Sequence, residues 1–264
     1  MNILFIGYGN MGSALGEIWH SSPKTDQIIA LKNKMSSQFD VDIVTSISDI
    51  PVIKYDFIVL AIKPQLAEQI ITILPDFIFK NSCIISLMAG VNINKIQKFT
   101  NKNNPIIRCM PNVAVSIQQG FTGLFSSQHL DPKIIAKIEH LFSLTGEFIW
   151  LANEEQLHAI TALSGSGPAY YHFLSELLVE SAKELGLSKH IAEKIITQTA
   201  FGSAAMQKNN PSSLEKLRLN VTSPNGTTQA AIDILSHNDE MKSLVHHAVN
   251  AAVKRSKHIE NNDN

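Results

Sequence analysis

The sequence has little cysteine and no excess of charge of either sign. It holds two cysteines in 264 residues, and 22 lysines and arginines nearly balance 23 aspartates and glutamates. Cys83 and Cys109 lie far apart, which excludes a disulfide framework or metal-ligand spacing and is typical of buried thiols in a reducing cytosol. A formal net charge of -1 lacks the basic surface that nucleic acid or an acidic membrane requires. We therefore expect a cytoplasmic protein with no nucleic-acid and no membrane partner.

Long apolar runs are absent as well. No run approaches the roughly 20 residues needed to span a bilayer, and the apolar start, Met1–Ile6, lacks the basic flank of a signal peptide and reads as a strand. Hydrophobic residues nevertheless make up 44% of the chain, which is enough for a real core. The length favours one large domain or two modest ones.

The first half alternates short apolar runs with helical patterns, which predicts a parallel sheet buried on both faces. We expect this half to form the first domain, which ends at residue 152. The expected strands are Asn2–Gly7, Gln27–Leu31, Phe57–Ile62, Cys83–Leu87, Ile106–Met110, Phe121–Phe125 and Glu147–Leu151. The expected helices lie near Met11–His20, Pro64–Leu74, Asn92–Phe99 and Pro132–Ser143.

The second half, residues 153–264, carries helical patterns alone. Long helices are expected over Pro168–Gly186, His190–Gln207 and Glu240–Lys257, with two shorter ones around 222–228. Their apolar residues extend beyond one stripe, and a helix that is apolar nearly all round must be buried. A domain of this size has few interior places for them, so we expect a subunit interface. The polar end, from about Lys257, is expected to fray.

A glycine-rich turn follows the first expected strand. In Gly7-Tyr8-Gly9-Asn10-Met11-Gly12, the first glycine permits a tight turn, the second a close approach of the backbone to a pyrophosphate, and the third close helix packing. The helix after it offers free N–H groups to the phosphates. The alternative is a simple glycine turn, but the order strand, turn, helix favours a dinucleotide and a Rossmann-type doubly wound α/β sheet. With the subunit interface expected of the second half, the expected fold is this sheet followed by an all-α dimerisation domain.

The second expected strand ends without the carboxylate that would hold the ribose 2′-hydroxyl of NAD. It ends instead in Leu31-Lys32-Asn33-Lys34, which favours NADPH, with Asn33 and Lys34 as candidate contacts; NADH stays possible. The alternative is that both lysines are ordinary solvated charges. Two further stretches end strands at the same edge, Ala61-Ile62-Lys63-Pro64 and Ala89-Gly90. The small residues in them would let a nicotinamide ribose approach, or would serve packing alone.

In the helical half, Val221–Thr228 reads as a turn that leads into a helix. Its last residues would present N–H groups and hydroxyls to a small anion such as a carboxylate. The alternative is helix capping by Ser or Thr without a ligand. His246 and His247 could look like metal ligands, but no second cluster with metal-ligand spacing accompanies them, so we expect no metal.

With these motifs in order, the sequence resembles the pyrroline-5-carboxylate reductase family over nearly its whole length. The matching stretches are Gly7–Gly12, Leu60–Gln65, Ala89–Val91, Arg108–Asn112, Ala162–Tyr170 and Val221–Thr228. The resemblance implies NAD(P)H-dependent reduction of 1-pyrroline-5-carboxylate to proline, and a homodimer built by the helical domain, with larger assemblies possible. It also implies that the substrate lies between the nicotinamide of one subunit and residues 223–228 of the partner.

Within that turn, the resemblance implies that the N–H groups of Gly226 and Thr227, with Ser223 and Asn220, hold the substrate carboxylate. It places Thr228 near the ring nitrogen, as the candidate catalytic residue. Asn225 departs from the family pattern, where a glycine is usual, and either alters the turn or adds a side-chain contact.

Two other functions are also compatible with parts of this sequence. A 3-hydroxyacid or 6-phosphogluconate type of dehydrogenase shares this two-domain plan but resembles enzymes with a lysine base on the long helix after the sheet domain, and no lysine occurs between Ser164 and Ser181. A non-catalytic NADP-binding sensor is opposed only by the intact substrate turn.

Overall fold

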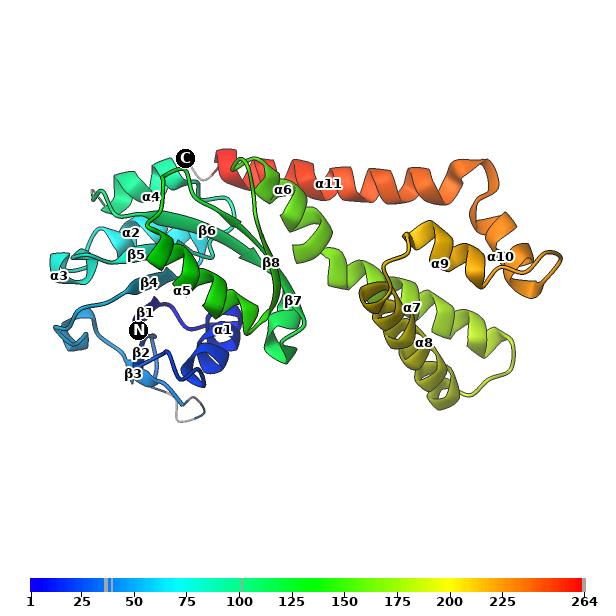
Figure 1. Cartoon of the computed structure of the whole chain (residues 1–264), viewed down its shortest axis with the longest axis horizontal. Helices are drawn as coiled ribbons and strands as arrows, with labels where there is room; N and C mark the ends of the chain where they lie inside the picture. Colours follow the sequence, from blue (N-terminus) through cyan, green and yellow to red (C-terminus); the bar gives the residue numbers. More distant parts are fainter. Residues whose placement is uncertain (36–37, 39, 101, 263–264) are drawn as a thin grey trace. The chain divides into compact units, whose positions relative to one another are not determined.

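The computed structural model describes residues 1–35, 38, 40–100 and 102–262. These form two compact units (Figure 1): residues 1–166 together with the chain from Ala252, and residues 167–251. The units divide after Ser166, whereas the boundary expected from the sequence lies between residues 152 and 153 and stays a prediction about the functional domains.

The first unit is built on one eight-stranded sheet in the order β3-β2-β1-β4-β5-β6-β7-β8. Every expected strand is present to within two residues at each end. The strand Asp42–Val44 was not expected, because three residues are too few to show the run of apolar residues that predicts a strand. The bounds are Asn2–Ile6 (β1), Gln27–Leu31 (β2), Asp42–Val44 (β3), Phe57–Leu60 (β4), Cys83–Ser86 (β5), Ile106–Pro111 (β6), Gly120–Phe125 (β7) and Gly146–Trp150 (β8).

One pairing differs from the expected parallel sheet. Strands β6 and β7 pair antiparallel, with Met110 opposite Gly123, while the other neighbours are parallel. The chain between them holds only the short 3₁₀ helix η3 (Val113–Ile117). A parallel crossover needs a dozen residues or more, so this connection allows only a reversal.

Helices cover both faces of the sheet, because alternate side chains of each strand point to opposite faces. Ile3 and Phe5 face the layer that contains α1 (Asn10–His20) and α5 (Pro132–Ser143). Leu4 and Ile6 face the layer of α2 (Ala67–Ile71), α3 (Asp76–Phe79) and α4 (Ile93–Thr100). The sequence therefore predicts the buried parallel core correctly.

The helix expected over Pro64–Leu74 is shorter and interrupted. The 3₁₀ helix η2 (Pro64–Leu66) precedes α2, which ends at Ile71. Pro75 disfavours helical conformation in the residue before it, and Ile70 to Ile73 are β-branched, which weakens a helix further. A 3₁₀ turn, η1 (Ile47–Asp49), lies after β3.

The second unit consists of helices joined by turns, with no strand among its described residues. After α6 (Gln156–Ile160) and the π-helical η4 (Thr161–Gly165) of the first unit, the chain forms α7 (Gly167–Glu184), α8 (Lys189–Asn209), α9 (Leu214–Asn220), α10 (Thr227–Leu235), η5 (His237–Asp239) and α11 (Glu240–Asn262). This confirms the expected helices, and α7 packs against α8.

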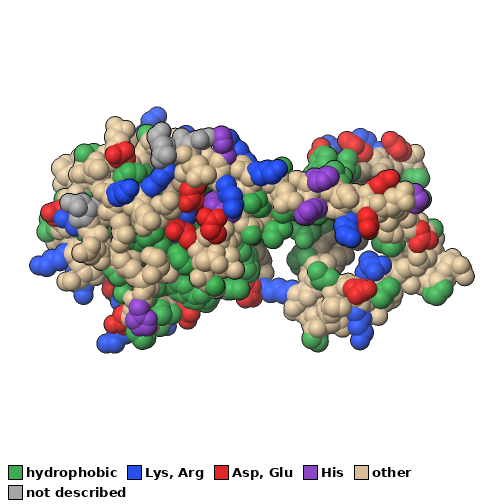
Figure 2. Space-filling view, turned by 90° about the horizontal axis from the view of Figure 1, so that it is seen from above, with side chains coloured by type: hydrophobic (Ala, Val, Ile, Leu, Met, Phe, Trp, Pro, Cys, Tyr) green, Lys and Arg blue, Asp and Glu red, His purple; other side chains and the backbone are tan. Residues whose placement is uncertain are grey.

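The second unit buries almost nothing by itself. Of residues 167–251, only Gly167 and Ala192 are buried. Figure 2 shows hydrophobic side chains on its surface among interspersed charges. Large apolar side chains exposed on α7 and α8 include Tyr171, Phe173, Leu174, Leu177, Leu178, Ile191, Ile195 and Phe201. None of the helices in the described part of the chain is long and apolar enough to cross a membrane.

The C-terminal end differs from its expectation. The sequence predicts fraying from about Lys257, but α11 continues to Asn262, and from Ala252 the chain packs with the first unit. Its Ser256 is buried and lies 2.9 Å from Nδ1 of His158. A polar composition alone does not reveal such a partner distant in sequence. The last two residues lie outside the described part.

Asp56 ties α5 to the amino ends of β1 and β4. It accepts hydrogen bonds from Lys137 Nζ (2.6 Å) and from the backbone N–H of Asn2 (2.9 Å). Burial alone would raise the pKa of Asp56, but these bonds and the Lys137 charge hold the pKa below its ordinary value. A lowered pKa means that the ionised form stabilises the fold, an effect present at neutral pH and lost as the pH falls below about 4.

We predict that Asp56→Asn lowers the free energy of unfolding by about 1–3 kcal/mol at pH 7, with a difference that shrinks below pH 4. Urea unfolding at fixed protein concentration measures both values. Asp76→Asn is the control, because the Asp76 carboxylate is 85% exposed in its pair with Lys102. Equal stability of the Asp56 variant and the wild type at pH 7 would contradict this assignment.

Candidate functional site

The strand order reverses at β1, which lies between β2 and β4. Ligands of open α/β sheets bind at the carboxyl edge at this kind of switch point. The backbone N–H of Gly7, directly after β1, donates to the carbonyl of Leu31 at the end of β2 (3.0 Å), and that of Ala61 donates to the carbonyl of Ile6 (2.9 Å). Three segments from distant parts of the sequence thus meet at one edge.

A cavity of about 510 Å³ opens at this edge. Seven of the predicted nucleotide contacts line it: Gly7, Gly9, Asn33, Lys34, Ala61, Ile62 and Lys63. Ile6, Tyr8, Leu31, Lys32, Leu66 and Ile70 complete the lining. The apolar pair Leu66 and Ile70 was not predicted, although its spacing of four residues is a recognisable signal for one helical face.

The glycine turn fits a pyrophosphate. Gly7 has a φ of +87°, and a Cβ there would lie 2.7 Å from the carbonyl oxygen of Ala61, so only glycine allows this crossing. A Cβ on Gly9 would meet nothing within 4 Å, which leaves its backbone open to a ligand. Gly9 is also the N-cap of α1 and provides no side-chain cap, so the first-turn N–H groups have no partner within the helix.

Four other predicted contacts lie beside the cavity rather than in its lining. Asn10, Met11 and Gly12 form the first turn of α1, and a Cβ on Gly12 would lie 3.2 Å from Cβ of Ala61. Gly12 therefore permits close packing of helix and strand, as the motif predicts. Pro64 begins η2.

The charge of the cavity suits a phosphate. Lys32, Lys34 and Lys63 contribute to the lining, and no acidic side chain does so among the described residues. Tyr8 lies beneath the turn and donates a hydrogen bond to Glu17 Oε1 (2.8 Å). Burial, and then this carboxylate, raise the pKa of Tyr8 above its usual range, so the phenol stays neutral and adds no negative charge.

Ala89 and Gly90, after β5, do not line this cavity. Gly90 is buried with a φ of +75°, and a Cβ there would lie 2.6 Å from Cγ2 of Ile259 in α11. Close approach of the C-terminal helix therefore requires a glycine at this position, as the packing alternative proposes. The cofactor contact predicted for this pair stays a prediction.

The predicted substrate turn lies in the second unit, between α9 and α10. Asn225 has a φ of +59°, and the N–H of Gly226 donates to the carbonyl of Ser223 (3.0 Å). Gly226 is the N-cap of α10 and provides no side-chain cap; the alternative, a Ser or Thr cap on this helix, is therefore wrong. The first-turn N–H groups of Thr227 and Thr228 have no partner within the helix. Asn220 ends α9.

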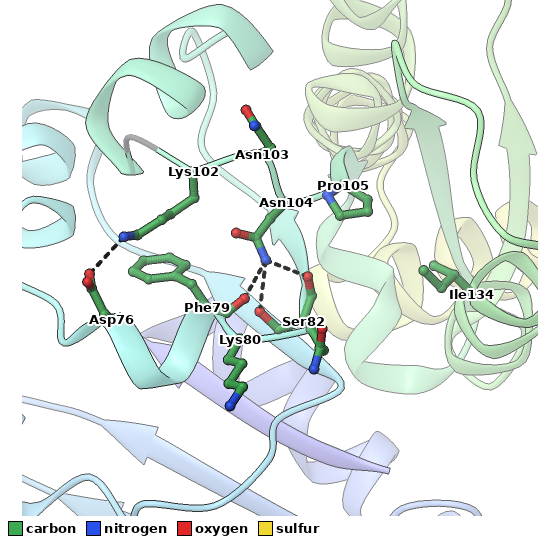
Figure 3. A pocket seen from close by; sticks show the side chains of 10 residues that line it. Asp76, Phe79, Lys80, Ser82, Lys102, Asn103, Asn104, Pro105 and Ile134 are labelled. Atoms are coloured by element: carbon green, nitrogen blue, oxygen red, sulfur yellow. Dashed lines mark hydrogen bonds and ion pairs between the residues drawn. The ribbon is translucent and has the colours of Figure 1, made fainter.

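A second cavity, of about 540 Å³, lies near the opposite edge of the sheet, where β5 and β6 begin. Figure 3 shows that two of its polar side chains have partners: Lys102 pairs with Asp76 at 2.9 Å, and Asn104 donates to the backbone carbonyls of Phe79 and Ser82. These bonds close the turns that precede the two strands. The cavity therefore has a structural explanation and does not lie at the switch point.

The two cysteines do not supply a nucleophile. Both are buried and free, as the sequence predicts. Burial raises the pKa of Cys83 to about 12 and that of Cys109 well above its usual value, so both stay as thiols at neutral pH. In the described part of the chain, no group of three or more His, Cys, Asp or Glu side chains is placed to hold a metal ion.

The fold and the cavity define a Rossmann-type dinucleotide-binding protein with a helical second unit. The family model "Pyrroline-5-carboxylate reductase dimerisation" matches residues 154–259, and "NADP oxidoreductase coenzyme F420-dependent" matches residues 2–90. Pyrroline-5-carboxylate reductase of Pseudomonas aeruginosa is 34% identical over 96% of this chain and 95% of its own length. The chain belongs to the pyrroline-5-carboxylate reductase family.

Solved structures agree with this assignment. A pyrroline-5-carboxylate reductase from Coxiella burnetii is 34% identical, with a TM-score of 0.88 over 98% of both chains. Pyrroline carboxylate reductase of Plasmodium falciparum, solved with NADP bound, is 26% identical, with a TM-score of 0.87 over 98% of both chains.

We predict that Gly9→Ala weakens dinucleotide binding by about 10-fold or more, because the new methyl group occupies the space through which the pyrophosphate approaches. The free energy of unfolding should change by less than about 1 kcal/mol, because the φ of -82° suits alanine. Nucleotide fluorescence titration and urea unfolding measure the two effects. Gly7→Ala, whose methyl group clashes with Ala61, should lower both the nucleotide affinity and the free energy of unfolding. Wild-type affinity in the Gly9 variant would exclude this turn as the phosphate site.

Proposed function

We propose that the chain reduces 1-pyrroline-5-carboxylate to proline with NADPH. The observation that carries the proposal is the switch-point cavity, with open glycine backbone, uncapped helix N–H groups and lysines at one edge. Oxidation of NADPH by the purified protein on addition of pyrroline-5-carboxylate, and none on addition of 3-hydroxyacids or 6-phosphogluconate, tests it. Binding of NADP(H) without turnover would instead support a sensor.

The proposed nucleotide contacts follow the cavity from its turn to its lysines. Gly7, Gly9, Asn10, Met11 and Gly12 bind the pyrophosphate through backbone N–H groups and the positive end of α1. Asn33 and Lys34 face the 2′-phosphate, where NAD-specific sites place a carboxylate. The remaining contacts lie toward the nicotinamide ribose: Ala61, Ile62, Lys63, Pro64, Ala89 and Gly90. The same turn accepts NADH with lower affinity.

The proposed substrate site is the turn before α10. Backbone N–H groups of Gly226 and Thr227 bind the carboxylate at the positive end of the helix, and Ser223 and Asn220 add side-chain donors. Asn225, whose left-handed backbone forms the turn, directs these groups to one side.

The reaction places a hydride on the imine carbon and a proton on the ring nitrogen. The reduced nicotinamide supplies the hydride when it is bound. The protein's own part is to orient the ring, exclude water and hold the charge of the substrate. A threonine hydroxyl is a poor general acid at neutral pH. We therefore assign to Thr228 a hydrogen bond that orients the ring nitrogen, while the proton comes from water or from an imine that is already protonated.

The active form is proposed to be a homodimer formed by the helical unit. Its support is the set of exposed apolar side chains on α7 and α8, together with the dimerisation model that matches residues 154–259. In this proposal the functional domains are residues 1–152 and 153–264, and the nucleotide of one subunit meets residues 223–228 of the partner. Dimers combine into larger homo-oligomers, and the enzyme works in the cytoplasm, where its thiols stay reduced.

We predict that Thr228→Ala lowers kcat/KM for pyrroline-5-carboxylate by about 10–100-fold, the loss of one hydrogen bond to a charged partner. Thr228→Ser should restore most of the rate because it keeps the hydroxyl. Thr222→Ala is the matched control, since the Thr222 hydroxyl already donates to the carbonyl of Arg218 (2.7 Å). Unchanged kcat/KM in a folded Thr228→Ala dimer would remove Thr228 from the mechanism.

We predict that Lys34→Glu raises KM for NADPH by about 10-fold or more and changes KM for NADH by less than about 3-fold, because only the 2′-phosphate meets the reversed charge. Steady-state rates with both cofactors give the comparison. Lys80→Glu, at the cavity of the opposite edge (Figure 3), controls for the change in net charge. An equal effect on both cofactors would show that Lys34 does not face the 2′-phosphate.

A further inference from the structure

The carboxyl edge of the sheet holds a cluster of charged side chains around a buried arginine, and the nucleotide and substrate sites do not use it. Arg108, in β6, is 4% exposed. Its Nη1 lies 2.8 Å from Oε1 of Glu154 and 3.7 Å from Oε2 of Glu260. His158 Nε2 lies 3.3 Å from the same Glu260 oxygen. The cluster thus joins β6, the chain before α6, and the last turns of α11.

The Glu260 carboxylate depends on these ion pairs. Its Oε2 is buried and accepts no hydrogen bond from the described residues. Burial of a charge costs several kcal/mol unless an opposite charge compensates for it. Attraction to Arg108 compensates for the buried Glu260 charge and so helps to hold the end of α11 against the rest of the sheet unit.

The two glutamates also hold the segment that follows β5. Oε1 of Glu154 accepts a hydrogen bond from the backbone N–H of Ile93 (2.9 Å). The backbone carbonyl of Glu260 accepts one from Lys95 Nζ (2.8 Å). Between β5 and these two anchors lies Gly90, where an added Cβ would lie 2.6 Å from Cγ2 of Ile259. Residues 90–95 are thus fixed by α11 on one side and by Glu154 on the other, and Arg108 connects the two.

We propose that Arg108, Glu154 and Glu260 are positioning residues, which use the C-terminal turns of α11 to fix the Ala89–Gly90 turn for the nicotinamide end of the nucleotide. The proposal rests on the proposed function in one respect, that this turn faces the nucleotide. In this proposal residues 252–262 help to position a nucleotide contact of the sheet unit and are not a frayed end.

The test compares two neutralised glutamates, Glu260 in the last turns of α11 and Glu155, which pairs with Lys257 of the same turns. Glu260→Gln keeps the size of the side chain and removes the buried charge. Glu155→Gln is the matched control, because the Glu155 carboxylate is 73% exposed in its pair with Lys257 at 3.1 Å, and such exposed pairs contribute little. Both variants are first shown to remain folded dimers by circular dichroism and light scattering.

Hydrogen exchange in the cofactor-free dimer provides a measurement that is independent of activity. In Glu260→Gln we expect amides 89–93 to exchange about 10-fold faster or more, since a local opening then needs less free energy. We also expect kcat/KM for NADPH to fall about 10-fold. A displacement of the bound nucleotide by about 1 Å is enough to lower the rate by this much or more. Glu155→Gln should change either quantity by less than about 3-fold.

The outcomes are decisive in either direction. Equal exchange in both variants would overturn the positioning role, whereas faster exchange with unchanged kcat/KM for NADPH would overturn the link to the nucleotide. Failure of the proposed function itself would appear separately, as no NADPH oxidation by the wild-type protein. If Glu260→Gln does not fold, Lys95→Met removes only the bond to the Glu260 carbonyl and leaves the buried charges paired, and the same two changes are expected.

Discussion

The helices of residues 167–251 impose the constraint on which the rest of the structure depends, because they bury almost none of their own side chains. Only Gly167 and Ala192 are buried there, while leucines, isoleucines and aromatics of α7 and α8 lie in solvent in the single chain. Full burial of one such side chain contributes about 1.5–3 kcal/mol. A second copy that covers these faces therefore gives the helical unit the core that it lacks.

This constraint has a consequence for the site. The open-backbone turn that suits a pyrophosphate and the uncapped turn that suits a carboxylate lie in different compact units of the chain. Helix α11 connects the units covalently: its first turns belong to the helical unit, and its last turns belong to the sheet unit. The buried cluster around Arg108 secures those last turns beside Gly90. The same helix therefore contributes to the exposed helical unit and to the sheet unit.

Local patterns made much of this predictable. The glycine turn, the strand alternation and the uncapped helix after Gly226 each depend on a few adjacent residues, and adjacent residues are what a sequence displays. Contacts between distant residues are not displayed in this way. Nothing around Arg108 indicates a partner at position 260, and a polar C-terminal segment has the composition of a frayed end. Gly90 shows the difference: the sequence indicates that a glycine is needed, and the structure shows Ile259 as a reason.

The β6–β7 reversal teaches a related lesson. Both strands are clear in the sequence, but their relative direction depends on the length and path of the connection at Val113–Ile117 rather than on the strands themselves. Prediction of the site survives this error, because the nucleotide edge is formed by β1, β2 and β4, whose connections are long enough for parallel crossovers.

The most direct test of a site shared between two subunits uses hybrid dimers. Subunits carrying Gly9→Ala and subunits carrying Thr228→Ala are co-expressed with different tags, and dimers that hold one of each are purified through both tags. If the nucleotide of one subunit meets the turn of the other, one of the two sites in each hybrid is free of both changes, and the hybrid should reach about half the wild-type NADPH oxidation rate per dimer. If each subunit forms its own site, every site carries one defect, and a hybrid no more active than the mean of its parents would contradict the account.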